Sequence, residues 1–361
     1  MSHRAMYEFS TWMKIKPTPS LYYIVPNANW VIDEIGAYLV RTISHTYDLS
    51  AHVSLTDRWL RGQIVHYGTL GSFVRNLQFG RIENNISIAT VFHGNRTEQF
   101  PELKRQLDLL VEHKHLPTQV ITASSLMADR LAQWQIPREK ITRIPLGVHL
   151  TNFQPTTLEH KKQIRHQLNI PDDHICIGSF QKDGNGWGEG DTPKLIKGPD
   201  VFLQVIERLH KHYPIHVLLT APSRGYVKRG LEQLGVPYTH RLLANHAEIV
   251  DYYHCLDLYL VASREEGGPE ALPESMATGI PLVSTRVGMA PDMIVHEQNG
   301  LLAEVEDVEG LAASVARLIE DDELRQKIID NGYQTVQAYD WSHLAHRYYH
   351  EVYQPILEQL T

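Results

Sequence analysis

Short apolar runs alternate with amphipathic helical stretches along most of the chain, and this alternation constrains the fold more than any other feature. We expect strands at 21–25, 64–67, 86–92, 120–123, 175–180, 215–219, 258–262 and 280–283. We expect helices at 30–44, 102–113, 125–134, 199–212, 224–234, 247–255, 308–320, 322–339 and 341–360. Mostly apolar runs of this length fit strands that are buried on both faces of a parallel sheet. Two successive arrays of this kind predict an α/β protein with two parallel sheets.

The composition is that of a soluble globular protein with room for two cores. The chain has 361 residues, of which 42% are hydrophobic and 21% charged, so two domains of ordinary size are expected. No apolar run approaches the roughly 20 residues that span a bilayer, and residues 1–20 lack the apolar segment of a secretory signal. Cys176 and Cys255 lack metal-ligand spacing, so we expect reduced, buried thiols and a cytoplasmic protein.

The charge is distributed unevenly between the two halves of the chain. Residues 1–155 contain 16 Lys and Arg against 12 Asp and Glu, whereas residues 156–361 contain 18 against 30. We favour solvated acidic helices as the explanation, because no dense Lys/Arg cluster of the polybasic kind occurs. The alternative is that the first half faces an anionic acceptor or makes a peripheral contact with the inner face of a membrane. No nucleic-acid partner is expected.

The segment from Ser263 to Gly279, SREEGGPEALPESMATG, contains the main candidate site. It links two expected strands, with Glu266 on the loop and Glu274 eight residues later on a short helix. Ligands of doubly wound sheets bind at such strand-end loops, and the first amides of a helix attract anions. The segment therefore offers donors for a phosphate and two carboxylates for sugar hydroxyls, which is what a nucleotide-sugar site requires.

Prolines and glycines indicate where the helix begins and which amides are available. Pro273 is tolerated only in the first turn, so the helix is expected to start near Ala271. Gly267 and Gly268 allow the backbone to approach a ligand closely. Pro269 has no N–H, which leaves the amides of Glu270 and Ala271 as donors to a diphosphate.

This unit resembles glycosyltransferase family 4 in its Glu-x7-Glu spacing, its Gly-Gly pair, its Glu-Ser-Met-Ala helix and the following Gly-Ile-Pro-Leu-Val-Ser-Thr. The resemblance implies the GT-B fold, in which two Rossmann-like domains face each other. It places an acceptor-side domain at 1–155, a nucleotide-sugar-binding domain at 156–340 and a returning C-terminal helix at 341–361. The junction at 144–149 resembles the interdomain segment of the family, with His149 in place of the usual Asp.

The same resemblance implies roles for individual side chains. Glu266 is expected to hold the donor sugar and Glu274 the ribose diol, rather than merely to complete a charge pattern with Glu270. His93, at the end of a strand and before a glycine, matches the histidine that contacts the sugar near the reacting carbon. The alternative for His93 is a purely structural role. A tyrosine stripe at 348, 349 and 353 is expected to attach the last helix to the first domain.

The expected diphosphate and base contacts depart from the family pattern. Gln181 or Lys182 stands where the family has arginine, so Lys182 and Lys197 are expected to supply two point charges, with Lys194 as a substitute. The base is expected against Arg241, Leu242 and Leu243. In the first domain, Pro26-Asn27-Ala28-Asn29 replaces the glycine pair of the family.

A glycine-rich segment at 183–191 is longer than the corresponding turn of the family. It lacks the Gly-Lys-Ser/Thr of a phosphate-binding loop, and Trp187 and Lys194 occupy positions where a calcium loop needs oxygen ligands. We favour a flap that closes over the donor with Trp187 as a wedge. The alternative is a loose surface insertion.

The expected activity is retaining transfer of a hexosyl group from a nucleoside-diphosphate sugar to an acceptor hydroxyl, in polysaccharide or glycolipid biosynthesis. The acceptor would be a glycan, a lipid-linked glycan or a small molecule. No Asp-x-Asp occurs, so no metal or other cofactor is expected, and helix amides and lysines would stabilise the leaving diphosphate. The alternatives are an epimerase or hydrolase of the same fold, and a non-catalytic protein that binds nucleotide sugars.

Overall fold

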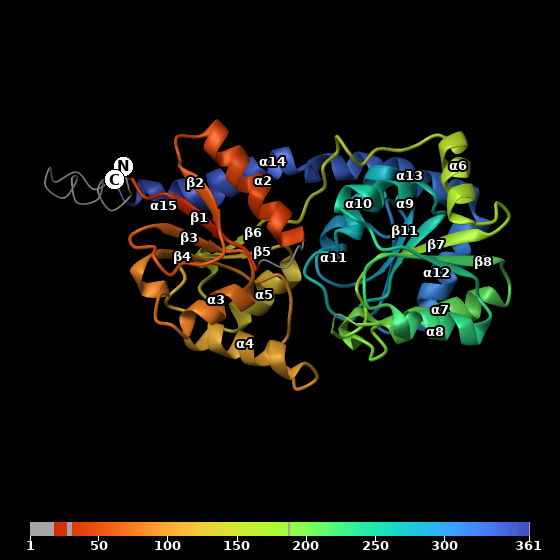
Figure 1. Ribbon diagram of the computed structural model, residues 1–361, viewed down its shortest axis with the longest axis horizontal. Helices are drawn as coiled ribbons and strands as arrows, with labels where there is room; N and C mark the ends of the chain where they lie inside the picture. The colour runs from red at the N-terminus through yellow and green to blue at the C-terminus, as the bar shows by residue number, and fades with distance from the viewer. Residues whose placement is uncertain (1–17, 27–30, 187, 361) are drawn as a thin grey trace, which may run out of the picture.

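The computed structural model describes residues 18–26, 31–186 and 188–360. The chain forms two α/β halves, each built on a six-stranded sheet (Figure 1). The first sheet has the order β2-β1-β3-β4-β5-β6 and consists of β1 (Leu21–Ile24), β2 (Ala51–Ser54), β3 (Ile64–Tyr67), β4 (Ile86–Thr90), β5 (Gln119–Thr122) and β6 (Ile141–Arg143). Its helices are α2 (Val31–Thr46), α3 (Leu70–Leu77), α4 (Pro101–Glu112) and α5 (Ser125–Gln133), with 3-10 turns at Ile82–Asn84 and Arg138–Lys140.

The second sheet has the order β12-β11-β10-β7-β8-β9. Its strands are β7 (Ile175–Ser179), β8 (Ile215–Leu219), β9 (Tyr238–His240), β10 (Leu258–Val261), β11 (Leu282–Thr285) and β12 (Leu301–Ala303). Its helices are α6 (Leu158–Leu168), α7 (Pro199–His210), α8 (Gly225–Leu234), α9 (Ile249–His254), α10 (Ala271–Thr278), α11 (Ala290–Met293), α12 (Val308–Glu320) and α13 (Asp322–Val336), with 3-10 turns at Leu195–Lys197, His246–Glu248 and Gln337–Tyr339. The strand order reverses between β7 and β10, and this reversal is where doubly wound sheets bind ligands.

The predicted fold class is confirmed, because neighbouring strands in both sheets pair in parallel. The predicted strands lacked β2, β6, β9 and β12, which are the four sheet edges. These strands have only three or four residues; β2, β6 and β9 contain polar residues and are partly exposed, and the apolar β12 has only three residues. Helices α3 and α6 were also not predicted, and β11 begins two residues later than expected because Gly279–Pro281 leads out of α10.

The C-terminal segment is not the single helix expected at 341–360. It consists of α14 (Trp341–Tyr348), a π-helical turn (Tyr349–Tyr353) and α15 (Gln354–Glu358). The π turn ends two residues before Pro355, which cannot donate an intrahelical hydrogen bond. The segment packs on the first half (Figure 1), where Tyr353 contacts His66 at 2.7 Å and Tyr349 stacks on Tyr47.

Two chain crossings run side by side between the halves. The Val148 amide donates to the Tyr339 carbonyl at 3.0 Å, and the Trp341 amide donates to the Val148 carbonyl at 3.1 Å. A Cβ at Gly147 would lie 2.5 Å from the Tyr339 carbonyl oxygen, so only glycine fits here.

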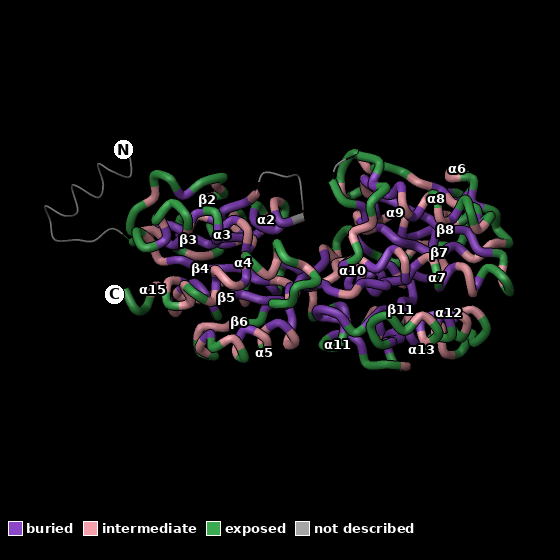
Figure 2. The backbone as a smooth tube through the Cα atoms, turned by 90° about the horizontal axis from the view of Figure 1, so that it is seen from below, coloured by how far each residue is buried: buried purple, intermediate pink, exposed green. Residues whose placement is uncertain are grey.

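The strands form the buried interior of each half (Figure 2), and Cys176 and Cys255 are free and buried, as predicted. Within the described residues, none of the helices combines the length and hydrophobicity needed to cross a lipid bilayer.

Candidate active site

Two cavities open at the carboxyl ends of β7 and β10. The larger has a volume of about 740 Å³ and extends from α2 to the loops that follow β8 and β9. The smaller, of about 300 Å³, lies over the loop that precedes α10. Phe180, His246 and Ile249 line both cavities, so the two form one continuous cleft. Its combined size suits a small-molecule ligand.

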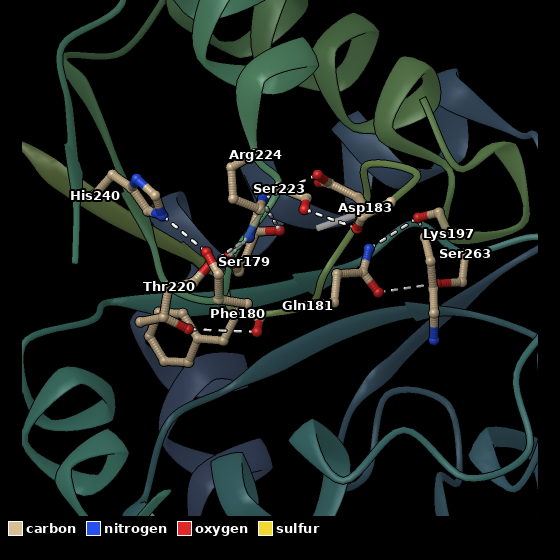
Figure 3. A network of polar contacts seen from close by, with 12 residues as sticks. Ser179, Phe180, Gln181, Asp183, Lys197, Thr220, Ser223, Arg224, His240 and Ser263 are labelled. Atoms are coloured by element: carbon tan, nitrogen blue, oxygen red, sulfur yellow. Dashed lines mark hydrogen bonds and ion pairs between the residues drawn. The ribbon is translucent and has the colours of Figure 1, made fainter. Parts of the chain in front are cut away.

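A polar network containing Glu266 lies at the centre of the cleft. The Lys197 ammonium contacts a Glu266 carboxylate oxygen at 2.6 Å, and the Ser263 hydroxyl donates to the same oxygen at 2.9 Å. The Gln181 side chain donates to the Lys197 carbonyl at 2.8 Å (Figure 3). Burial acts to raise the pKa of Glu266, but the charge and hydrogen bond of Lys197 hold it below its usual 4.5. The cleft therefore contains an ionised carboxylate beside a lysine.

The backbone around Lys197 explains why this lysine reaches Glu266. Gly198 adopts φ +63°, and a Cβ there would lie 1.9 Å from the Ala262 carbonyl oxygen, so the turn packs directly on the end of β10. Arg264, which follows β10, donates to both carboxylate oxygens of Asp200 at 2.7 Å. This bidentate pair fixes the lysine turn against the loop that carries Glu266.

Only one of the three lysines expected at the diphosphate, Lys197, lines the cleft, where it pairs with Glu266. Lys182 and Lys194 line neither cavity. Burial, followed by the charge of Lys197, lowers the pKa of Lys194. The charge of Lys182 acts on Lys194 in the same direction, and burial lowers the pKa of Lys182 itself. A diphosphate position built on these lysines stays a prediction.

Glu274 lies at the other end of the smaller cavity. It accepts a hydrogen bond from the Tyr253 hydroxyl at 2.7 Å and contacts His246 Nε2 at 3.2 Å. Burial acts to lower the pKa of His246, but its hydrogen bond to Glu274 and three nearby carboxylates raise it to about 9. Burial and the Glu274 charge raise the pKa of Glu270 to about 8, as expected for like charges four residues apart on a helix. His246 therefore partly neutralises an acidic pair at the start of α10.

The contact between His246 and Glu274 predicts pH-dependent stability. The pKa of His246 in the folded protein, about 9, exceeds its ordinary 6.5, so the charged pair stabilises the fold fully below pH 6.5 and is lost as the pH rises through 9. We expect His246→Gln to lower the Tm by a few degrees at about pH 6 and to change it little at about pH 10. Calorimetry at both pH values measures this difference, and an equal loss of Tm at both would contradict it.

The first turn of α10 leaves few amides for an anion. The Leu272 amide donates to the Pro269 carbonyl and the Glu274 amide to the Glu270 carbonyl. The amides of Glu270 and Ala271 remain as the candidate donors, and both residues line the smaller cavity.

The two glycines before α10 differ in position. Gly268 lines the smaller cavity, whereas Gly267 is buried against the other half of the molecule. A Cβ at Gly267 would lie 2.4 Å from the Cβ of Phe92. The glycine at 267 therefore permits contact between the two halves, a role that sequence reasoning did not assign to it.

His93 follows β4 in the first half and lines neither of the two cavities. It is half-buried, and burial, followed by the Lys197 charge, lowers its pKa. The charges of Glu266 and Glu265 act on this pKa in the opposite direction. Contact of His93 with a donor sugar therefore stays a prediction.

The residues expected at the base divide into two groups. Leu242 and Leu243 line the larger cavity, whereas Arg241 does not and instead donates to the neighbouring His240 carbonyl. Across the same cavity Ala221 adopts φ +67° and accepts a hydrogen bond from His240 Nε2 at 2.8 Å. A non-glycine residue in this conformation is strained, and such strain concentrates at ligand sites.

A fully buried ion pair lies beside the residues that line the cleft (Figure 3). Arg224 Nε lies 3.0 Å from an Asp183 carboxylate oxygen, with both side chains at most 1% exposed. The guanidinium also donates to the Ser179 carbonyl at 2.6 Å and to the Thr220 carbonyl at 3.1 Å. Arg224 thereby ties the ends of β7 and β8 together beside the cleft.

The glycine-rich segment 183–191 is docked on the start of α8. The Gly225 amide donates to the Glu189 carbonyl at 2.6 Å, and the Tyr226 amide donates to the Gly190 carbonyl at 3.0 Å. A Cβ at Gly190 would lie 2.2 Å from the Ser223 carbonyl oxygen, so the loop packs tightly there. The segment is therefore not a loose insertion, and none of its described residues lines the cleft as a closed flap would. Trp187 and the loop residues 27–29 lie outside the described residues.

Beside the site, an ion pair joins the first half of the molecule to the second. Arg130 contacts Glu265 at 2.6 Å, and the Gly94 amide donates to the same carboxylate at 3.1 Å. Sequence reasoning missed this pair, along with His246, Tyr253 and Arg224. Contacts between the halves depend on how the two halves are placed relative to each other, and a local sequence pattern does not report this placement. The one available signal was that Glu265 is adjacent to Glu266.

Known proteins are similar to this chain in sequence. Residues 193–335 match the family model of glycosyl transferases group 1. The D-inositol 3-phosphate glycosyltransferase of Corynebacterium urealyticum is 26% identical over 238 residues, covering 63% of this chain and 54% of the relative. The putative teichuronic acid biosynthesis glycosyltransferase TuaC of Bacillus subtilis is 27% identical over 198 residues, covering 54% and 46%. The chain thus spans about half the length of the curated relatives that it matches.

Solved structures resemble the whole fold. The sucrose-phosphate synthase of Thermosynechococcus elongatus superposes with a TM-score of 0.75 at 16% identity, covering 94% of this chain and all of its own. Anabaena HepE in complex with UDP gives 0.71 at 16% identity, covering 94% and 99%. The two facing sheets therefore have the GT-B architecture. The part of the second half that matches the model of glycosyl transferases group 1 is the part that contains Glu266 and Glu274, in agreement with the resemblance seen in the sequence.

Proposed function

We propose that this protein transfers a sugar from a nucleoside diphosphate to an acceptor hydroxyl, with the anomeric configuration retained. The observation that carries the proposal is the ionised Glu266, 2.6 Å from Lys197, in the same cavity as Glu274. Glu274 would accept hydrogen bonds from the ribose, and Glu266 would hold the sugar hydroxyls. The base would occupy the larger cavity beside Leu243.

The proposed reaction is an attack on the same face from which the diphosphate leaves. The leaving phosphate oxygen takes the proton of the acceptor hydroxyl as the glycosidic bond to the donor breaks and the new one forms. Lys197 and Lys194, together with the amides of Glu270 and Ala271, would stabilise the charge that develops on the diphosphate. The neutral His93 can donate a hydrogen bond to the sugar from the opposite half.

The relatives suggest which donor and acceptor to test first. Structures of HepE contain UDP or UDP-glucose, so UDP-hexoses are the first donors to test. The names of the curated relatives point to a polyol phosphate or a polysaccharide precursor as acceptor. A membrane-bound acceptor would be reached through the first half.

Incubation of donor and acceptor, followed by NMR of the product, tests the reaction class. We expect a new glycosidic bond with the anomeric configuration of the donor. Inverted product would contradict retention. Free or isomerised sugar formed without acceptor would instead indicate a hydrolase or an epimerase.

We also expect transfer to be independent of divalent metal, because Lys197 and the amides of Glu270 and Ala271 would stabilise the leaving diphosphate. His246, Glu270 and Glu274 have ligand atoms within 4.8 Å of one another, but a cation there would compete for the proposed ribose carboxylate. Initial rates with excess EDTA and with added Mg²⁺ or Mn²⁺ should agree within about twofold, a difference that corresponds to well under 1 kcal/mol. A loss of activity in EDTA that is restored by metal would overturn this expectation.

A further inference from the structure

Three side chains with metal-binding atoms meet where α6 packs on α9, outside the cleft. His160 lies in the first turn of α6, and Asp251 and His254 lie three residues apart on α9. His160 Nε2 is 3.6 Å and His254 Nδ1 3.9 Å from the same Asp251 oxygen, and the three ligand atoms lie within 4.8 Å of one another. When ligands bind one Zn²⁺ at about 2.0–2.2 Å in a tetrahedral arrangement, the ligand atoms lie slightly closer to one another than these three atoms do.

The hydrogen bonding of His254 directs a lone pair into this cluster. His254 Nε2 lies 2.8 Å from the Gln154 carbonyl oxygen, which can only accept, so Nε2 carries the proton. Nδ1 is then unprotonated, and it is buried without a hydrogen-bond partner in a residue that is only 9% exposed. Metal-binding histidines commonly donate their other ring nitrogen to a carbonyl in this way.

The groups facing Nδ1 cannot satisfy it as hydrogen-bond partners. The Asp251 carboxylate is an acceptor and lies beyond hydrogen-bond distance. His160 presents Nε2 to the same carboxylate oxygen. Two nitrogens and one oxygen thus converge with no donor within hydrogen-bond reach of Nδ1 among the described residues, an arrangement that a cation would complete.

We propose that His160, Asp251 and His254 form a zinc site. Two imidazoles and one carboxylate are a ligand set that Zn²⁺ commonly takes, with water in the fourth position. The exposed side of Asp251 leaves that position open to solvent. The ion would fasten α6 to α9 and would thereby support the helix whose Tyr253 binds Glu274. The ion would lie outside the cleft, so it would take no part in the metal-independent transfer proposed above.

Zinc titration of the full chain, stripped with EDTA and desalted, tests the site. Competition with a chromophoric chelator gives the number of bound ions and their affinity. We expect His160→Ala and Asp251→Asn each to weaken one zinc equivalent at least about tenfold. His166→Ala is the matched control, because His166 is an exposed histidine on the same helix, and it should bind zinc as the unaltered chain does.

Thermal unfolding provides a second readout that does not depend on activity. Zinc should raise the Tm of the unaltered chain and of His166→Ala but not the Tm of His160→Ala. Circular dichroism should show that His160→Ala is folded. His246→Ala should retain the zinc equivalent, because His246 belongs to the cleft. Equal zinc binding by the unaltered chain and His160→Ala, or equal losses in His160→Ala and His166→Ala, would overturn the proposal and indicate adventitious binding.

Discussion

Glu266→Gln is expected to lower kcat at least about a hundredfold while the protein remains folded, which is the usual scale when one preorganised polar contact to a transition state is lost. The carboxylate is 7% exposed, ionised and bound to Lys197 and Ser263. Glutamine preserves the shape and can still accept from Ser263, but it removes the charge that positions Lys197 and the sugar. The loss should therefore appear in kcat more than in nucleotide affinity.

Steady-state rates with saturating donor, alongside circular dichroism, measure this effect. Glu323→Gln is the control, because Glu323 is an exposed glutamate at the start of α13 in the same half. It should retain full activity. A Glu266→Gln protein with near-normal kcat would remove Glu266 from the reaction and would leave the polar network with only a structural role.

Arg224→Met is expected to lower the free energy of unfolding by about 3–5 kcal/mol, because it leaves the buried charge of Asp183 without its partner. Burial already raises the pKa of Asp183, and the Arg224 charge is the largest of the effects that oppose this rise. The substitution also removes the donors to the Ser179 and Thr220 carbonyls. The ends of β7 and β8 would then lose the group that joins them.

Urea unfolding followed by tryptophan fluorescence measures this loss. Arg229→Met is the matched control, because Arg229 pairs with Asp191 at the surface and both side chains are about half exposed. Exposed pairs of this kind contribute about 0–1 kcal/mol. If Arg224→Met unfolds at the same urea concentration as Arg229→Met, the buried pair does not support the site. Asp183→Asn combined with Arg224→Met should recover part of the loss, since no buried charge then remains unpaired.

The sequence predicted the central strands because these are buried on both faces and therefore apolar throughout. Strands β3, β8, β10 and β11 are completely buried. The edge strands β2, β6 and β9 escaped prediction because they are short and contain polar residues, whereas β12 is apolar and buried but only three residues long. At a parallel sheet, the carboxyl ends of neighbouring strands meet. For this reason Glu266, on the loop after β10, could be assigned to the cleft, whereas Lys197 was assigned through the resemblance to the family.

The remaining features depend on how separate loops pack. His246 meets Glu274 only because the turn after β9 lies beside α10. Arg224 is buried by the glycine-rich loop, whose composition suggested mobility although its carbonyls are bound to α8. Gly267 was assigned to a phosphate but packs against Phe92. In each case the partner comes from a distant segment, so a local sequence pattern carries no information about the contact.

The proposed function requires the cleft to bind a nucleoside diphosphate with Glu274 against the ribose. Calorimetric titration of UDP, GDP and ADP into the protein and into Glu274→Gln, both in EDTA, tests this claim most directly. At least one nucleotide should bind, and Glu274→Gln should bind it about tenfold or more weakly, the scale of one hydrogen bond to a charged group. Absence of binding by all three nucleotides, or equal affinity for both proteins, would contradict the account.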